Sequence, residues 1–279
     1  MSFAYRPAVA GTNPIFCIRD WIGTSSRFAY ARALMACALL LLTATLSAQQ
    51  FSALLITETA GWQHESSFAA IPALNEMAQR HDFRLDLKQK AMPLTADQLK
   101  NYDVIIMVNT TGDVFTDAEQ QVFEDFIRSG KGWVGVHAAA DTEYDWKWYT
   151  DMVGHMFYIH PHVQTAMVDV HDTKFPGLEN WPARRLWTDE FYEYLDAERK
   201  PGFNYLITVD EKTYQTDANW GPGKVSKGHG DFHPMSWYHN YDGGRAWYTN
   251  FGHVPAVFDD PAFREHLYGG IFWAVRGVK

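Results

Sequence analysis

The 279-residue sequence contains very little cysteine. Its two cysteines, Cys17 and Cys37, both fall within the first 48 residues, so the rest of the chain has no thiol. This excludes a disulfide, a cysteine nucleophile and a thiolate metal site from residues 49–279. A metal site there would have to use imidazole and carboxylate ligands.

Positive charge is also scarce. The chain has 24 lysine and arginine residues against 33 aspartate and glutamate residues, which gives a formal net charge of −9. Four of the basic residues and one acidic residue precede residue 49, so the remainder carries 20 basic and 32 acidic residues. This balance argues against nucleic acid and anionic membrane surfaces as partners.

Long apolar runs are rare, and the longest lies near the N-terminus. Arg27 and Arg32 precede an apolar run from Ala33 to Leu46, and small residues follow up to Ala48. This order predicts a signal peptide within residues 1–48, with an uncleaved anchor as the alternative. The run is short for a membrane span, so we expect a periplasmic or secreted protein without a membrane partner after signal removal. The sequence does not indicate an oligomeric state.

Residues 51–277 are expected to form one α/β domain. Its first half alternates predicted strands with predicted helices: strands at Ala53–Thr57, Phe83–Leu87, Asp103–Asn109 and Trp133–Val136, a helix at Ser67–Arg80, and helices opened by capping patterns at Thr95 and Thr116. This alternation predicts a doubly wound, mainly parallel sheet of the flavodoxin-like type, with its ligand at the carboxyl edge.

The second half is less regular and richer in strands. We predict strands at Val163–Val170 and Tyr205–Val209, a hairpin around Asp242-Gly243-Gly244, and a last helix capped by Asp260 with Pro261 at its first position. Two long loops remain, Ala139–His162 and Asp210–His233. Loops of this length in a compact domain usually carry function.

His137 is the first candidate for chemistry. The segment Gly132–Thr142 (GWVGVHAAADT) reads as a strand followed by small residues, and such a tight turn lifts one polar side chain into the crevice at the sheet edge. Other polar groups that follow strands are expected to line the same cleft: Glu58 and His64, Asn109 to Asp113, and Asp141, with His233 and His253 in the second half.

A divalent, zinc-type metal is a candidate cofactor, held by His137, His233 and Glu190. Imidazoles with a carboxylate suit such an ion, although no local ligand motif is present. The close pair His160 and His162 flanks Pro161, which extends the chain and points the two rings to opposite faces. His81, His171 and His266 are expected to be peripheral or packed, and no nucleotide cofactor is expected.

Acid and base chemistry is assigned to His137, His233 and Glu190. Glu190 follows Asp189 in a predicted loop between aromatic residues, where partial burial would raise a carboxyl pKa. A solvated acidic turn is the alternative.

Aromatic residues make up 15% of the chain, and many lie beside histidine or aspartate. Trp62, Trp146 and Trp237 are candidates for stacking on a sugar, with core packing as the alternative. The predicted substrate contacts are these three tryptophans together with His64, Asp141 and His253.

With these residues identified, the chain from about Ala53 to Val275 resembles the ThuA-like (trehalose utilisation) family, which is related in fold to class I glutamine amidotransferases. The resemblance rests on several motifs in order: Thr59–His64 (TAGWQH), Tyr102–Asp113 (YDVIIMVNTTGD), Gly135–Trp146 (GVHAAADTEYDW), Thr188–Tyr192 (TDEFY), His233–Trp237 (HPMSW), Tyr241–Thr249 (YDGGRAWYT) and Gly252-His253.

The resemblance implies sugar metabolism without glutaminase chemistry. Amidotransferase relatives place a cysteine nucleophile where this chain has His137, and their His-Pro-Glu reads His233-Pro234-Met235 here. The family further implies action on glycosides oxidised to a ketone at carbon 3, by lyase, hydrolase or isomerase chemistry. The alternatives are a non-catalytic carbohydrate-binding protein of the envelope and an ordinary glycosidase, which is disfavoured because no carboxylate pair stands out.

Overall fold

The computed structural model describes residues 49–88, 90, 92–196 and 198–278. The signal-peptide or anchor prediction for residues 1–48 lies outside these residues. Nine strands form the main sheet: β1 (Ser52–Ile56), β2 (Arg84–Leu87), β3 (Val104–Val108), β5 (Gly132–Val136), β8 (Gln164–Val170), β9 (Arg184–Asp189), β11 (Asn204–Val209), β12 (Pro234–Tyr241) and β13 (Gly244–Thr249). No helix among the described residues is long and apolar enough to cross a membrane.

The strand order of the sheet is β2-β1-β3-β5-β13-β12-β11-β8-β9. Neighbours from β2 to β13 are parallel, and those from β13 to β9 are antiparallel. The order 2-1-3 at the parallel end is the flavodoxin-like arrangement, so the predicted doubly wound sheet with a β-rich second half is confirmed.

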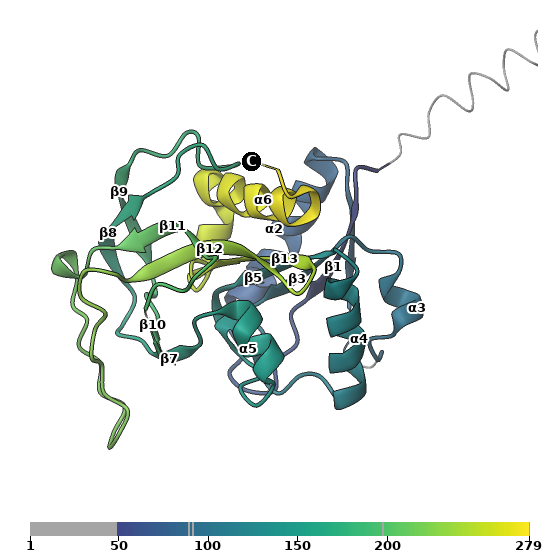
Figure 1. Cartoon of the computed structure of the whole chain (residues 1–279). Helices are drawn as coiled ribbons and strands as arrows, with labels where there is room; N and C mark the ends of the chain where they lie inside the picture. Colours follow the sequence, from purple (N-terminus) through teal and green to yellow (C-terminus); the bar gives the residue numbers. More distant parts are fainter. Residues whose placement is uncertain (1–48, 89, 91, 197, 279) are drawn as a thin grey trace, which may run out of the picture. The chain divides into compact units, whose positions relative to one another are not determined.

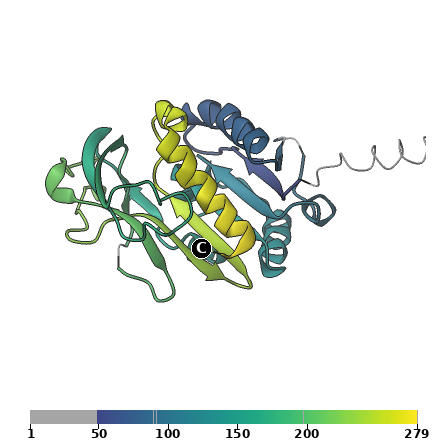
Figure 2. The same cartoon turned by 90° about the horizontal axis from the view of Figure 1, so that it is seen from above.

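Helices cover both faces of the sheet (Figures 1 and 2). The helices α2 (Ser66–Arg80) and α6 (Pro261–Arg276) lie on one face, and α4 (Asp117–Arg128) and α5 (Lys147–Val153) lie on the other, with α3 (Ala96–Leu99) beside α4. Thr95, Thr116 and Asp260 cap their helices as predicted.

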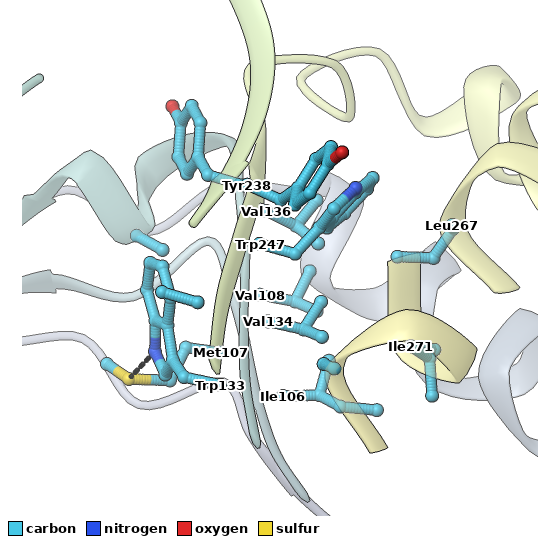
Figure 3. Close-up of a cluster of buried hydrophobic side chains, with 14 of the residues drawn as sticks. Ile106, Met107, Val108, Trp133, Val134, Val136, Tyr238, Trp247, Leu267 and Ile271 are labelled. Carbon is cyan, nitrogen blue, oxygen red and sulfur yellow. Dashed lines mark hydrogen bonds between the residues drawn. The ribbon is translucent and has the colours of Figure 1, made fainter. Parts of the chain in front are cut away.

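The core between the sheet and α6 follows from strand alternation (Figure 3). Ile106 and Val134 point toward Ile271 of α6, whereas Met107 and Trp133 point to the opposite face, where the Trp133 Nε1–H donates to Met107 Sδ at 3.2 Å. Because both faces are buried, the central strands read as unbroken apolar runs.

The prediction of a loop over Ala139–His162 was wrong in part. It contains the end of the short helix η1 (His137–Ala140), then β6 (Asp141–Thr142), α5 and β7 (Phe157–Ile159). β6 pairs with β4 (Thr111–Gly112), and β7 pairs with β10 (Glu193–Tyr194). The second predicted loop is largely irregular, apart from η2 (Glu211–Thr213), and η3 (Pro255–Asp259) precedes α6.

Candidate active site

His137 occupies the turn predicted for it. It follows β5 directly and adopts φ +49°, a left-handed conformation that is costly for a residue with a side chain. The ring is fully buried, and its Nδ1–H donates to the Asn250 carbonyl oxygen at 2.7 Å. Because a carbonyl oxygen only accepts, Nδ1 carries a proton, and Nε2 is the ring nitrogen that faces Glu190 and His253.

Four donor side chains converge at this point: His64, His137, Glu190 and His253. One ligand atom from each lies within 4.8 Å of all the others. The separations are 3.4 Å from His137 Nε2 to Glu190 Oε2, 3.2 Å from His253 Nδ1 to Glu190 Oε2, and 3.2 Å between the two imidazole nitrogens. We call these four residues the donor cluster.

The donor cluster is assembled from distant parts of the chain. His64 comes from the loop after β1, and His137 from the turn after β5. Glu190 directly follows β9, and His253 lies in the loop after β13. Asp189 joins the last two segments, because its buried carboxylate accepts the backbone N–H groups of Gly252, His253 and Val254 at 2.8–3.1 Å. Asp189 is the last residue of β9, so the prediction that it lies in a loop with Glu190 was wrong.

Burial and mutual proximity set the charges of the cluster. Burial lowers the pKa of His64 to about 3, with help from His137 and His253, and burial beside His137 lowers the pKa of His253 to about 4. Both rings are therefore neutral at pH 7 and offer lone pairs. His64 Nδ1 is buried and has no hydrogen-bond partner in the described part of the chain.

The pKa of Glu190 moves opposite to the direction expected from the sequence. Burial raises that pKa, but the imidazoles of His137 and His160 outweigh burial and hold it at about 2. His160 Nδ1 lies 3.0 Å from Glu190 Oε1, the oxygen that does not face His137 and His253. Glu190 is therefore an anion, and each of its oxygens has a different environment. For Asp189, burial does raise the pKa.

A cavity of about 460 Å³ opens over the cluster. The residues that line it are Trp62, His64, Asp141, Phe157, His160, Glu190, Tyr192, Trp220 and His253. A volume of this size suits a small-molecule site, which typically measures ~300–1,000 Å³. Burial raises the pKa of Asp141, whose Oδ1 accepts the Tyr144 hydroxyl at 2.7 Å.

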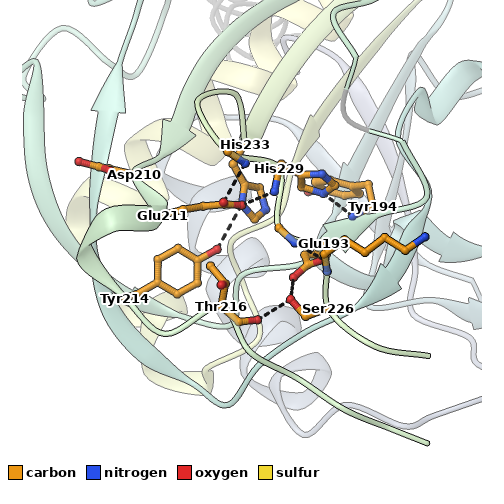
Figure 4. A network of polar contacts seen from close by, with 12 residues as sticks. Glu193, Tyr194, Asp210, Glu211, Tyr214, Thr216, Ser226, His229 and His233 are labelled. Carbon is orange, nitrogen blue, oxygen red and sulfur yellow. Dashed lines mark hydrogen bonds and ion pairs between the residues drawn. The ribbon is translucent and has the colours of Figure 1, made fainter. Parts of the chain in front are cut away.

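The structure does not bring His233 to the donor cluster. Its Nε2–H donates to the Tyr192 carbonyl oxygen at 2.8 Å, and its Nδ1 lies 2.7 Å from Glu211 Oε1 and 3.1 Å from the Tyr214 hydroxyl. Figure 4 shows this separate polar network. His233 precedes β12, which lies two strands away from β5 in the sheet. The His233 ring therefore contacts η2 and not the turn after β5.

Two of the three predicted sugar-stacking tryptophans lie in the core. Trp146 packs on Phe123 and donates to Glu124, and Trp237 is 1% exposed and donates to the Val153 carbonyl oxygen. Trp62, by contrast, lines the cavity together with the predicted contacts His64, Asp141 and His253. Glu58 pairs with Lys88, and Asn109 donates to Ser66, so neither lines the cavity.

Sequence reasoning missed His160 and Trp220 as cavity residues. The extended backbone at Pro161 does place the neighbouring histidines differently, since His160 lines the cavity and His162 is exposed. That contrast was a usable signal for His160. Trp220 lies in the long segment after β11, which had been expected to carry function.

Solved structures with the same fold include two ThuA-like proteins. One, from Bacteroides uniformis, is 25% identical with a TM-score of 0.67, covering 84% of this chain and 94% of that one. The other, from Parabacteroides merdae, is 17% identical with a TM-score of 0.60, covering 81% and 90%. A search of proteins with curated functions gave no match.

The family comparison agrees with these structures and with the motifs quoted above. The ThuA family model, described as "Trehalose utilisation", matches residues 52–274. This match spans the whole sheet and every residue of the donor cluster. The chain therefore belongs to the ThuA family.

Proposed function

We propose that the chain is a carbohydrate-processing enzyme that acts on 3-keto-glycosides or related sugars, by lyase, hydrolase or isomerase chemistry. Membership of a family described by trehalose utilisation indicates a carbohydrate-related role. The observation that carries the enzymatic proposal is the convergence of three imidazoles and a carboxylate at one point, where His64, Glu190 and His253 line a cavity and His137 lies buried behind them. A protein that only bound hydroxyl groups would not need such a buried, mutually perturbed set.

The proposal includes a zinc-type ion held by His64, His137, Glu190 and His253. A tetrahedral ion with bonds of ~2.0–2.1 Å separates its ligand atoms by about 3.3 Å. The three separations among His137, Glu190 and His253 are 3.2–3.4 Å, so these residues fit. The unpartnered His64 Nδ1 fits as well, and the bond from His137 Nδ1 to the Asn250 carbonyl oxygen turns Nε2 toward the other donors. When bound, such an ion would supply Lewis-acid polarisation of the ketone oxygen.

The residues outside the donor cluster would move the protons. A ketone at carbon 3 acidifies the proton on carbon 2, so a base can remove it while the bond from carbon 1 to the glycosidic oxygen breaks and a carbon 1–carbon 2 double bond forms. Asp141 lines the cavity and is not in the cluster, so we assign it this base role. The same carboxyl then returns the proton to the leaving oxygen, and the elimination balances without water or an oxidant.

Metal analysis and turnover together test this function. Purified protein stripped with a chelator should regain thermal stability with Zn²⁺, and the reloaded protein should turn over methyl 3-keto-glucoside but not methyl glucoside. Glu190→Gln should weaken zinc binding by at least tenfold, whereas Glu198→Gln, at an exposed position, should not. Equal turnover of the unoxidised sugar would overturn the elimination, and sugar binding without any turnover would favour the non-catalytic alternative.

A further inference from the structure

The cavity is buried at one end and aromatic at the other. Glu190 and His64 on its floor are at most 5% exposed, whereas Trp62 is 71% exposed and Trp220 is 47% exposed. Both indoles line the cavity. We call Trp62 and Trp220 the aromatic pair.

The backbone that carries Trp62 is fixed although its ring is in water. The Trp62 carbonyl oxygen accepts the hydroxyls of Thr59 and Thr111 at 3.0 and 2.9 Å. The neighbouring Ala60 and Gly61 N–H groups donate to the Thr111 carbonyl oxygen at 2.8 and 3.2 Å. An exposed ring on a fixed backbone loses little conformational entropy when a ligand covers it.

Trp220 is held in a comparable way. The backbone N–H of Trp220 donates to the Lys224 carbonyl oxygen at 2.9 Å, and the Lys224 ammonium lies 5.0 Å from the centre of the indole. The His160 ring meets the same indole edge-on at 4.7 Å, so one residue contacts both Trp220 and Glu190.

The ends of the segment that carries Trp220 are anchored by the polar network of Figure 4. The buried Glu193 carboxylate accepts the Ser226 hydroxyl and the N–H groups of Lys227 and Gly228, the last two at 2.9 and 3.1 Å. Glu211 accepts the N–H of His229 at 2.6 Å and also meets the ring of His233. The network therefore sets the position of Trp220 without touching the donor cluster.

Resting on the proposed function, we propose that the aromatic pair binds the leaving-group ring of a glycoside, so that the substrate is a disaccharide or larger glycoside and not a single hexose. The reacting ring must reach the buried floor, which leaves the other half of the glycoside at the exposed end. The apolar C–H face of a pyranose stacks on an indole, and two exposed indoles at one cavity mark a binding surface.

Calorimetry tests the aromatic pair independently of turnover. The disaccharide trehalose should bind the wild-type protein about tenfold more tightly than methyl glucoside, and Trp62→Ala or Trp220→Ala should abolish that difference. Trp62→Phe should retain most of it. Leu186→Ala, which changes an exposed apolar side chain of β9 outside the cavity, is the control.

Kinetics supply the second arm of this test. Each alanine variant should lower kcat/KM at least tenfold on 3-keto-trehalose while changing it less than twofold on methyl 3-keto-glucoside. Equal losses on both sugars, or wild-type binding that does not distinguish disaccharide from monosaccharide, would overturn the assignment of the pair. Absence of turnover on both keto sugars would instead overturn the proposed reaction and leave the calorimetric comparison valid.

Discussion

The two carboxylate oxygens of Glu190 contact different residues of the candidate site. Oε2 faces His137 and His253, and Oε1 meets His160. A carboxylate that serves as a metal ligand is usually oriented by a hydrogen bond to its other oxygen, and removal of such a partner weakens metal binding. His160 is thus assigned to positioning Glu190 and not to the ligand set.

This assignment predicts the effect of His160→Gln. The substitution removes the imidazole beside Glu190 Oε1, so the zinc affinity, measured by competition with a chromophoric chelator, should fall by about 10- to 100-fold. His162→Gln, two residues away and exposed, should leave the affinity unchanged. Equal affinities for wild type and His160→Gln would show that Glu190 does not depend on this contact.

At the residue scale, the sequence revealed the candidates that follow parallel strands. His64 and Asp141 could be predicted at the cavity, and His137 at the donor cluster beneath it, because the carboxyl ends of parallel strands share one edge. His233 was misplaced because its position relative to β5 depends on the order of the antiparallel strands, which local patterns do not encode. Trp146 and Trp237 were candidate sugar contacts with core packing as the alternative, and core packing is what the structure shows, because sequence alone does not distinguish a buried indole from an exposed one.

At the scale of elements, the segment between β11 and β12 is the least regular part of the described chain. Its order depends on side-chain acceptors, of which Glu193 is the most buried, at 1% exposure. A buried carboxylate that accepts two backbone N–H groups and a hydroxyl replaces the hydrogen bonds that a strand would have provided.

We expect Glu193→Gln to loosen this segment. An amide group offers one acceptor oxygen where the carboxylate offered two, so a buried acceptor is lost at a cost of about 1–3 kcal/mol. Hydrogen exchange should speed up at the Lys227 and Gly228 amides. Asp231→Asn, in the same segment with a side chain that is 94% exposed, should not change it. Unchanged exchange in Glu193→Gln would mean that other contacts order the segment.

Elements were predictable where pattern and capping agreed. The capped helices and the hairpin around Asp242-Gly243 were found within a residue or two, because caps and two-residue turns have local rules. β9 was missed because it has only two apolar residues, Leu186 and Trp187, between the charged residues at its ends, as suits a strand at the end of a sheet. Helix α5 was missed because it is seven residues long and has no side-chain cap.

At the scale of the whole molecule, the parallel and antiparallel halves share one sheet, and α6 packs across β13, β5 and β3. His266 of α6 is fully buried in this layer, beside the rings of Trp181 and Trp247. Its Nε2 lies 3.3 Å from the Thr249 hydroxyl, and its Nδ1 has no partner among the described residues. The ring is therefore packed, one of the two positions expected for it.

His266 should make the stability of the fold depend on pH. Burial lowers its pKa in the folded protein to about 3, compared with 6.5 in the unfolded chain. Between these values the unfolded chain binds more protons, so stability is complete above pH 6.5 and is lost as the pH falls toward 3. For this one ring, the free energy of unfolding should drop by about 2 kcal/mol between pH 7 and pH 5.

Urea unfolding of wild type and His266→Leu at both pH values isolates this contribution, because the other titrating groups cancel in the difference. Leucine fills a similar volume and cannot take a proton, so the stability advantage of wild type over the variant should shrink by about 2 kcal/mol on acidification. His162→Leu should show no such change, because that side chain is exposed. A difference between wild type and His266→Leu that stays constant from pH 7 to pH 5 would show that α6 admits the charged ring, which the aromatic walls around it oppose.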